Sequence, residues 1–94
     1  QNGYFHAGII STLADNASGY AAFSLMEERA QILTVEFKIN FMAPGSGEHL
    51  LARGKVLKAG KTLSVCNSEV YSVKDGVETF CASAQVTLMA LLPK

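Results

Sequence analysis

The chain has 94 residues, of which 49% are hydrophobic and 17% are charged, and its formal net charge is zero. This length allows a single domain over residues 1–94, and the composition is too apolar for a disordered chain. A nucleic-acid-binding protein normally carries a basic excess, and a membrane span needs ~20 uninterrupted apolar residues, so neither class fits. Two cysteines are too few for a disulfide scaffold. We therefore expect a cytoplasmic protein with reduced thiols, part of whose surface a partner covers.

Residues 8–26 are predicted to form a helix. Apolar residues recur there at the spacing of a buried stripe, namely Ile10, Leu13, Ala14, Ala17 and Ala21. The centre of the segment is rich in small residues, which allow another backbone to come close. We therefore expect a sheet to wrap this helix.

From residue 32 onward the pattern predicts four strands, over 32–42, 48–59, 62–73 and 77–91. Alternation assigns one apolar face to each strand: Leu33, Val35, Phe37, Ile39 and Phe41 in the first, Leu50, Ala52 and Val56 in the second, and Phe80, Ala82, Ala84, Val86 and Leu88 in the last. Short turns favour antiparallel neighbours. The expected architecture is an α+β fold in which one helix covers the apolar face of a four-stranded antiparallel meander.

Asp15 is the only side chain among residues 1–26 that is charged at neutral pH. It lies about 140° from the centre of the expected buried stripe on a helical wheel, which favours a solvent-facing carboxylate. Its face, however, holds small or weakly polar residues and no lysine, arginine or glutamate: Ser11, Ser18, Gly19 and Ala22. Such a face suits a cleft or a partner, so both interpretations of Asp15 remain open.

The start of the helix, His6-Ala7-Gly8, is a second candidate site. The first four N–H groups of a helix lack intrahelical partners and can hold an anion or a developing oxyanion. His6 can act as a base or as a packed, hydrogen-bonded structural residue. No second histidine, cysteine or carboxylate stands at metal-ligand spacing, so we predict no metal.

The turn between the second and third predicted strands, Lys58-Ala59-Gly60-Lys61-Thr62, is a third candidate. The pattern is consistent with an ordinary hairpin whose lysines are solvated. It is equally consistent with a site where two amines and backbone N–H groups bind a phosphate. The spacing of a P-loop is absent.

The segments Asn2–Gly8 and Leu13–Asp15 together resemble the motif of hotdog-fold acyl-CoA thioesterases of the phenylacetate-pathway (PaaI-like) type. Residues 34–44 resemble the second strand of that family, and residues 56–63 resemble its hairpin near coenzyme A. The resemblance covers essentially the whole chain. It implies a hotdog fold, a long central helix wrapped by a curved antiparallel sheet, and a homodimer or homotetramer with its active site at the dimer interface. The family usually has a further N-terminal helix and strand, so we expect a longer protein.

The resemblance also implies roles for individual residues. Asp15 takes the position of the catalytic carboxylate, as general base or nucleophile. The Ala7 N–H, with Gly8 adjacent, takes the position that polarises the thioester carbonyl, although the family commonly has glycine where this chain has Ala7. Thr34 of the other subunit is expected to position water or substrate.

The expected substrate-binding residues are Asn2, His6 and the hairpin residues Lys58, Gly60 and Lys61, the last three near coenzyme A. The leading hypothesis is hydrolysis of an aromatic or medium-chain acyl-CoA to the free acid and CoA, with no metal or redox cofactor. One alternative is a non-catalytic acyl-CoA-binding module. The other is an enoyl-CoA hydratase or dehydratase, for which His6 and Asp15, nine residues apart, are unfavourably placed.

Overall fold

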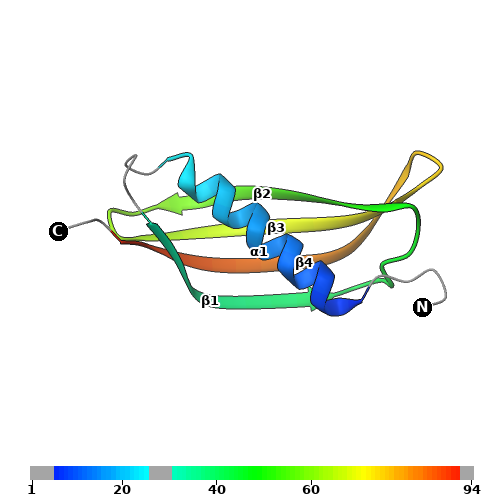
Figure 1. Cartoon of the computed structure of the whole chain (residues 1–94), viewed down its shortest axis with the longest axis horizontal. Coiled ribbons are helices and arrows are strands. Elements are labelled where there is room, and N and C mark those ends of the chain that lie inside the picture. Colours follow the sequence, from blue (N-terminus) through cyan, green and yellow to red (C-terminus); the bar gives the residue numbers. More distant parts are fainter. Residues whose placement is uncertain (1–5, 26–30, 92–94) are drawn as a thin grey trace.

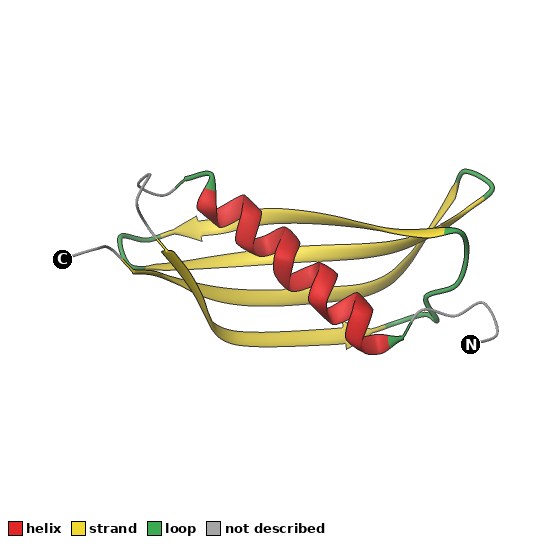
Figure 2. Cartoon of the chain, in the orientation of Figure 1, coloured by secondary structure: helices red, strands yellow, loops and turns green. Residues whose placement is uncertain are grey.

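The structure, a computed structural model of the chain, describes residues 6–25 and 31–91. It contains α1 (Ala7–Phe23), β1 (Gln31–Phe41), β2 (His49–Ala59), β3 (Leu63–Lys74) and β4 (Val77–Leu91). α1 runs diagonally across one face of the curved sheet (Figure 1), and the described elements leave the opposite face bare (Figure 2). The predicted helix and four strands are confirmed, although α1 ends at Phe23 and the predicted end at residue 26 lies outside the described residues.

The strand order is β1-β4-β3-β2, and every neighbouring pair is antiparallel. Strands β2, β3 and β4 form the predicted meander, but β1 pairs with β4 rather than with β2, so the predicted four-stranded meander is wrong. The connection over residues 42–48 crosses from one edge of the sheet to the other. A segment of that length reaches about 20 Å, which exceeds the ~14 Å across three strand spacings.

Bulges change which side chains face α1. In β1 the register shifts between Thr34 and Glu36, because Val35 is an extra residue on that strand. Leu33 and Val35, expected on the buried face, are each 52% exposed. Ile32 and, beyond the bulge, Phe37 and Ile39 pack against the core instead.

A second register shift reverses the expected side of Phe80. In β4, residues Ala82, Ala84, Val86 and Leu88 are buried as predicted. The shift between Val70 and Tyr71 on β3 pairs Tyr71 with Phe80, and their ring centroids lie 5.3 Å apart. Phe80 therefore belongs to the sheet face that points away from α1.

The buried face of α1 consists of Ile10, Ala14, Ser18 and Ala22. Leu13, Ala17 and Ala21, expected in the same stripe, are only partly buried. Compared with the expected stripe, the buried face is rotated about the helix axis toward Ser18. Ser18 can be buried because its hydroxyl has a hydrogen-bond partner: the Oγ atoms of Ser18 and Ser68 lie 2.6 Å apart. Ser68 also donates to the Ala14 carbonyl at 2.7 Å. This pairing satisfies polar groups that would otherwise be costly to bury.

Gly54 of β2 is the point where α1 comes closest to the sheet. A Cβ atom built there would lie 2.6 Å from the carbonyl carbon of Ala17 and 3.0 Å from the Ser18 nitrogen. No side chain fits between the two backbones. The expectation that small residues at the helix centre permit a close approach is therefore confirmed.

The outer sheet face carries a charged network across β2, β3 and β4. Arg53 makes a bidentate ion pair with Glu78, with N···O distances of 3.0 and 2.9 Å. The Arg53 guanidinium lies 4.9 Å from the centroid of the Tyr71 ring, and the Tyr71 hydroxyl donates to Glu69 Oε1 at 2.7 Å. The hydrogen bonds from Arg53 lower the pKa of the Glu78 carboxyl.

The lowered pKa of Glu78 predicts a pH-dependent contribution to stability. Glu78→Gln should lower the melting temperature near neutral pH. The ion pair stabilises the fold above the pKa of Glu78 in the unfolded chain, and this contribution is lost as the pH falls through the lowered folded-state pKa. The difference should therefore close in acid, as measured by thermal unfolding across pH. In an Arg53→Met background, Glu78→Gln should have no pH-dependent effect on the melting temperature. If the pH-dependent difference in melting temperature persists in that background, the Arg53–Glu78 ion pair is not its cause.

Candidate functional site

Asp15 and Thr34 form a hydrogen-bonded pair between α1 and β1. The Thr34 hydroxyl donates to Asp15 Oδ1 at 3.0 Å. The bulge at Val35 makes this possible, because it places Thr34 on the side of the strand that faces α1. The contact lies within one chain. The role expected for Thr34 of the other subunit, to position water or substrate, stays a prediction.

Two hollows meet at this pair. One, of about 230 Å³, is lined by Ser11, Thr12, Asp15, Thr34 and Phe37. The other, of about 310 Å³, is lined by Asp15, Asn16, Gly19, Tyr20, Phe23, Ile32, Thr34 and Leu88. Both lie between α1, which crosses the sheet diagonally (Figure 1), and the edge strand β1. Asp15 is partly buried at the border of both hollows, so its surroundings favour the interpretation as a cleft carboxylate.

His6 caps the start of α1. Its backbone is extended, with ψ at 143°, and its Nδ1 accepts a hydrogen bond from the Gly8 N–H at 3.0 Å. The His6 carbonyl accepts from the N–H groups of Ile9 and Ile10. His6 is therefore hydrogen-bonded, as the structural interpretation expects, but it is exposed rather than packed. Its role in substrate binding stays a prediction. Because Nδ1 accepts, a neutral His6 carries its proton on Nε2.

The capping arrangement separates the roles expected for Ala7 and Gly8. The Gly8 N–H is held by His6, so it is not available to a substrate in this conformation. Within residues 6–25 and 31–91, the Ala7 N–H has no acceptor. Ala7 also lines a hollow of about 410 Å³ with Ile10 and residues 41–45. Among the described residues, Ala7 is therefore the first-turn residue whose N–H stays without an acceptor.

Ala7 and Asp15 do not meet in one chain. They are eight residues apart on the same helix, which corresponds to about 12 Å along its axis. A single carbonyl group needs contacts of about 3 Å on each side. These two candidate groups therefore cannot act on the same carbonyl from one copy of α1.

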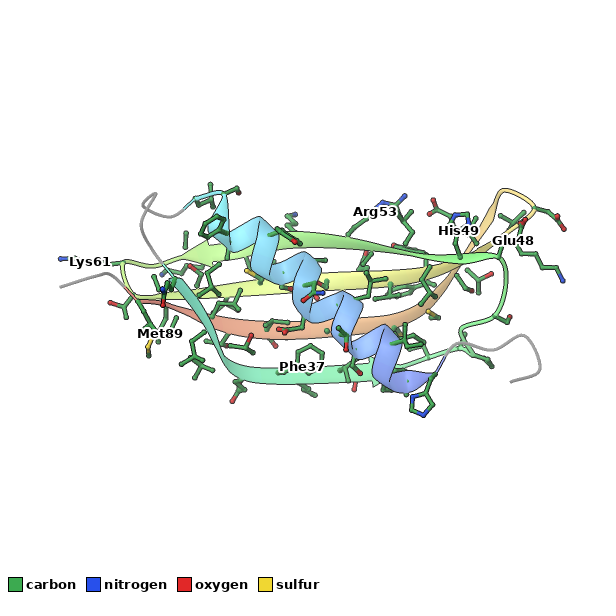
Figure 3. The ribbon with its side chains drawn as sticks, in the orientation of Figure 1. Phe37, Glu48, His49, Arg53, Lys61 and Met89 are labelled. Atoms are coloured by element: carbon green, nitrogen blue, oxygen red, sulfur yellow. The ribbon has the colours of Figure 1, made fainter. Side chains whose placement is uncertain are left out.

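The hairpin residues lie apart from the start of α1. Lys61 is at one end of the molecule, and Glu48 and His49 are at the other (Figure 3). His49 lines a hollow together with His6, so the start of α1 lies at the end opposite Lys61. Lys58, Gly60 and Lys61 are exposed. The Gly60 N–H donates to the Leu63 carbonyl at 2.8 Å, which makes Gly60 part of a tight turn.

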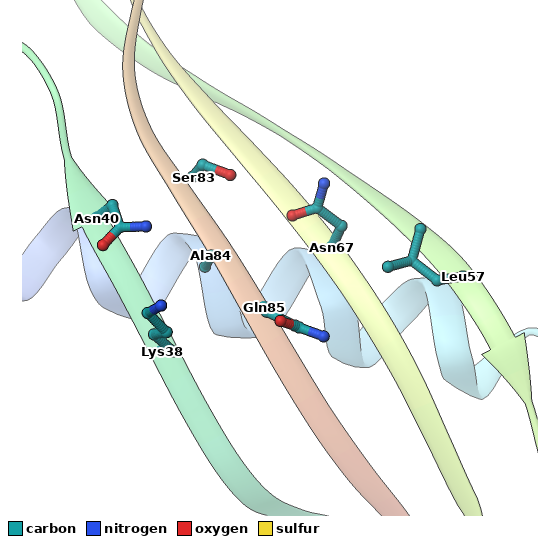
Figure 4. Close-up of a pocket in the computed structure, with 7 residues that line it drawn as sticks. All are labelled: Lys38, Asn40, Leu57, Asn67, Ser83, Ala84 and Gln85. Carbon is teal, nitrogen blue, oxygen red and sulfur yellow. The ribbon is translucent and has the colours of Figure 1, made fainter.

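Other hollows in the described part of the chain are lined by neither Asp15 nor Thr34. One, of about 780 Å³, lies on the β2 flank of α1 and is lined by His6, Gly8, Ile9, Thr12, Leu13, Asn16, Glu48, His49 and Leu50. Another, of about 250 Å³, lies on the outer sheet face (Figure 4) and is lined by Lys38, Asn40, Leu57, Asn67, Ser83, Ala84 and Gln85. Neither hollow was predicted from the sequence, because each combines residues from separate elements. Asn2 lies outside the described residues.

Cys66 and Cys81 are free and buried. Burial raises the pKa of both thiols, so they remain protonated at neutral pH and are poor nucleophiles. Within the described ranges, no three histidine, cysteine, aspartate or glutamate side chains gather as a potential metal site. No helix in the described part of the chain has both the length and the apolar character to cross a membrane.

The chain is similar to known proteins in both sequence and structure. A family model described as the thioesterase superfamily matches residues 2–79. The structure of a thioesterase family protein from Silicibacter pomeroyi is 53% identical, with a TM-score of 0.95 over 99% of this chain and 68% of that chain. The structure of a Bacillus halodurans protein with CoA is 27% identical, with a TM-score of 0.87 over 94% of this chain and 60% of that chain.

Human acyl-coenzyme A thioesterase 13 is 33% identical over 75 residues, which are 79% of this chain and 53% of that protein. The chain spans about half the length of the curated relatives it matches. The structural matches confirm the predicted hotdog arrangement of one helix on a curved antiparallel sheet.

Proposed function

Because the chain belongs to the thioesterase superfamily, we propose that it hydrolyses the thioester of an aromatic or medium-chain acyl-CoA to the free acid and CoA. The observation that carries this proposal is the Asp15 carboxylate, which borders two hollows and is oriented by the Thr34 hydroxyl at 3.0 Å. The CoA in the Bacillus halodurans structure and the name of the human relative support acyl-CoA as the substrate class.

In the proposed reaction Asp15 accepts a proton from a water molecule as the water oxygen attacks the thioester carbonyl carbon. The Ala7 N–H donates to the carbonyl oxygen, where negative charge develops. The tetrahedral intermediate then expels the CoA thiolate, which takes the proton from Asp15. If Asp15 acts as nucleophile, its carboxylate attacks the thioester carbonyl carbon, the C–S bond breaks and the CoA thiolate leaves, so that an anhydride forms. Water then hydrolyses the anhydride, which releases the acid, regenerates the Asp15 carboxylate and supplies the proton for the thiolate. No metal or redox cofactor enters either route.

The complete site needs a second copy of the chain, since Ala7 and Asp15 lie too far apart on one helix. β1 is an edge strand of the sheet and presents the half-exposed apolar side chains of Leu33, Val35 and Phe41. Met42, which follows the strand, is also half-exposed. On α1 beside it, Tyr20 and Phe23 are also exposed. We propose a homodimer formed along the β1 edge, in which antiparallel helices bring the partner's Ala7 N–H to Asp15. A homotetramer of such dimers remains a prediction.

The hairpin residues are proposed to contact the CoA moiety. Lys58 and Lys61 are exposed, and exposed amines suit the phosphate groups of CoA. The Gly60 N–H is already held by Leu63, so its part is to keep the turn tight. Asn2 is proposed to help orient the substrate, as the family resemblance implies. His6 would contribute by capping α1 beside the reacting carbonyl.

Ala7→Pro tests the proposed oxyanion donor. Proline lacks a backbone N–H and is favoured at the first position of a helix, and the extended backbone of His6 suits a following proline. Hydrolysis should therefore fall by about 10²–10³-fold in kcat, while the far-ultraviolet circular dichroism stays unchanged. Ala7→Ser, which keeps the N–H, is the matched control and should retain most activity. Wild-type kcat in Ala7→Pro would contradict the role.

Thiol release from a panel of acyl-CoAs tests the function as a whole. The proposal predicts turnover, whereas a binding module would retain acyl-CoA without releasing thiol. A hydratase or dehydratase would need a histidine that works with the carboxylate. His6 is instead committed to capping α1, which disfavours that reaction. Hydration of an enoyl-CoA without thiol release would contradict the proposed hydrolysis.

A further inference from the structure

We propose that the larger hollow beside Asp15 receives the acyl group, and that Gly19 sets the longest acyl chain accepted there. This inference rests on the proposed thioester hydrolysis. It assigns Gly19 a specificity-determining role, because the absence of a side chain at this position leaves room in the hollow.

The hollow combines polar and apolar side chains. Its polar lining residues are Asp15, Asn16 and Thr34, and the others are Gly19, Tyr20, Phe23, Ile32 and Leu88. Leu88 is 1% exposed, so it forms a floor fixed in the core. The volume of about 310 Å³ lies at the lower end of the range for ligand sites, which favours short to medium acyl chains over long ones.

Gly19 is the residue whose side chain is missing from this wall. Glycine in the middle of a helix is less stable than alanine, so its presence calls for a reason. At Gly54 the reason is the helix backbone, but a Cβ atom built on Gly19 would have nothing within 4 Å. Packing within the described chain does not require glycine there. A side chain at this position would extend into the hollow and occupy the space proposed for the acyl chain.

The test compares butyryl-, octanoyl- and dodecanoyl-CoA in Gly19→Ala and Gly19→Leu variants. Each methylene that leaves the hollow should cost about fourfold in kcat/KM. Gly19→Ala should therefore lower the octanoyl-to-butyryl ratio about fourfold, and Gly19→Leu should lower it on the order of 100-fold. Butyryl-CoA itself should change by less than about twofold. An unchanged ratio, or an equal loss for every chain length, would overturn the inference.

A matched control places bulk on the other flank of α1. Ile9 lines the hollow beside β2 and is 56% exposed, so Ile9→Phe should leave the chain-length ratio unchanged. If Ile9→Phe shifts the ratio as Gly19→Leu does, the acyl group lies on the β2 flank and the inference is wrong. Thermal unfolding checks the fold, and Gly19→Ala should melt at or above the wild-type temperature.

Calorimetric binding separates this inference from the proposed function. In an Asp15→Asn background, octanoyl- and butyryl-CoA can be titrated without turnover. Gly19→Leu should then weaken octanoyl-CoA binding selectively. If the wild type hydrolyses no acyl-CoA but this selective loss is seen, hydrolysis fails while the assignment of the hollow stands. If hydrolysis is found and binding shows no chain-length effect, the role of Gly19 fails alone.

Discussion

Asp15→Asn is expected to lower kcat for thioester hydrolysis by about 10³-fold, within the range for loss of a general base. The substitution keeps the size of the side chain and an oxygen that can accept from Thr34, whose hydroxyl donates to Asp15 Oδ1. It removes the group that takes a proton from water or attacks the carbonyl. KM should change little, because the amide still fills the same space between the two hollows. Steady-state thiol release on the preferred acyl-CoA measures both constants.

Asp75→Asn is a matched control for this substitution. Asp75 lies in the turn between β3 and β4 with φ at 51°, a left-handed conformation that asparagine also tolerates. The change of charge is the same, but kcat should remain at the wild-type value. Retention of wild-type kcat in Asp15→Asn would remove Asp15 from the mechanism.

Among the variants proposed for this chain, Gly54→Ala is expected to lose the most stability, about 3 kcal/mol in the free energy of unfolding. Its Cβ would lie 2.6 Å from the Ala17 carbonyl carbon, and the obstacle is helix backbone, which cannot change rotamer to make room. α1 would have to move away from β2 and loosen the Ser18–Ser68 contact. For a domain of this size the melting temperature should fall by roughly 15 °C.

Gly19→Ala supplies the control with the same chemical change. Its added methyl group meets open space, so stability should rise by about 0.5–1 kcal/mol because alanine favours a helix interior. Thermal unfolding of the two variants beside the wild type gives both values. Equal melting temperatures for Gly54→Ala and the wild type would show that α1 does not approach β2 as closely as described.

The elements of the fold and the packing of one helix on a sheet could be predicted from the sequence, whereas the strand order and several side-chain faces could not. Regular alternation predicted the strands. On β1, however, it assigned Leu33 to the wrong face, because the extra residue Val35 exchanges the two faces of the strand. The pairing of β1 with β4 depends on how far residues 42–48 extend, which composition does not reveal. Ser18 was assigned to a weakly polar face, since its buried partner Ser68 lies fifty residues away.

The candidate site was predictable in its residues but not in its geometry. Motif resemblance named Asp15 and Thr34, and the structure brings them together within one chain. The cap formed by His6, which withdraws the Gly8 N–H from the expected site, depends on a side-chain rotamer. The hollow beside Gly19 depends on the diagonal crossing of α1 over the sheet. Neither property has a signal in residue spacing.

Asp15 and the Ala7 N–H are proposed to act together from two copies of the chain. A mixed oligomer of Ala7→Pro and Asp15→Asn tests this shared site, because each variant alone lacks one half of every site. In a dimer with one copy of each, one site combines both intact halves. After denaturation and refolding together in equal amounts, thiol release should return to roughly a quarter of the wild-type specific activity. Activity that stays at the level of the separately refolded variants would contradict the shared site.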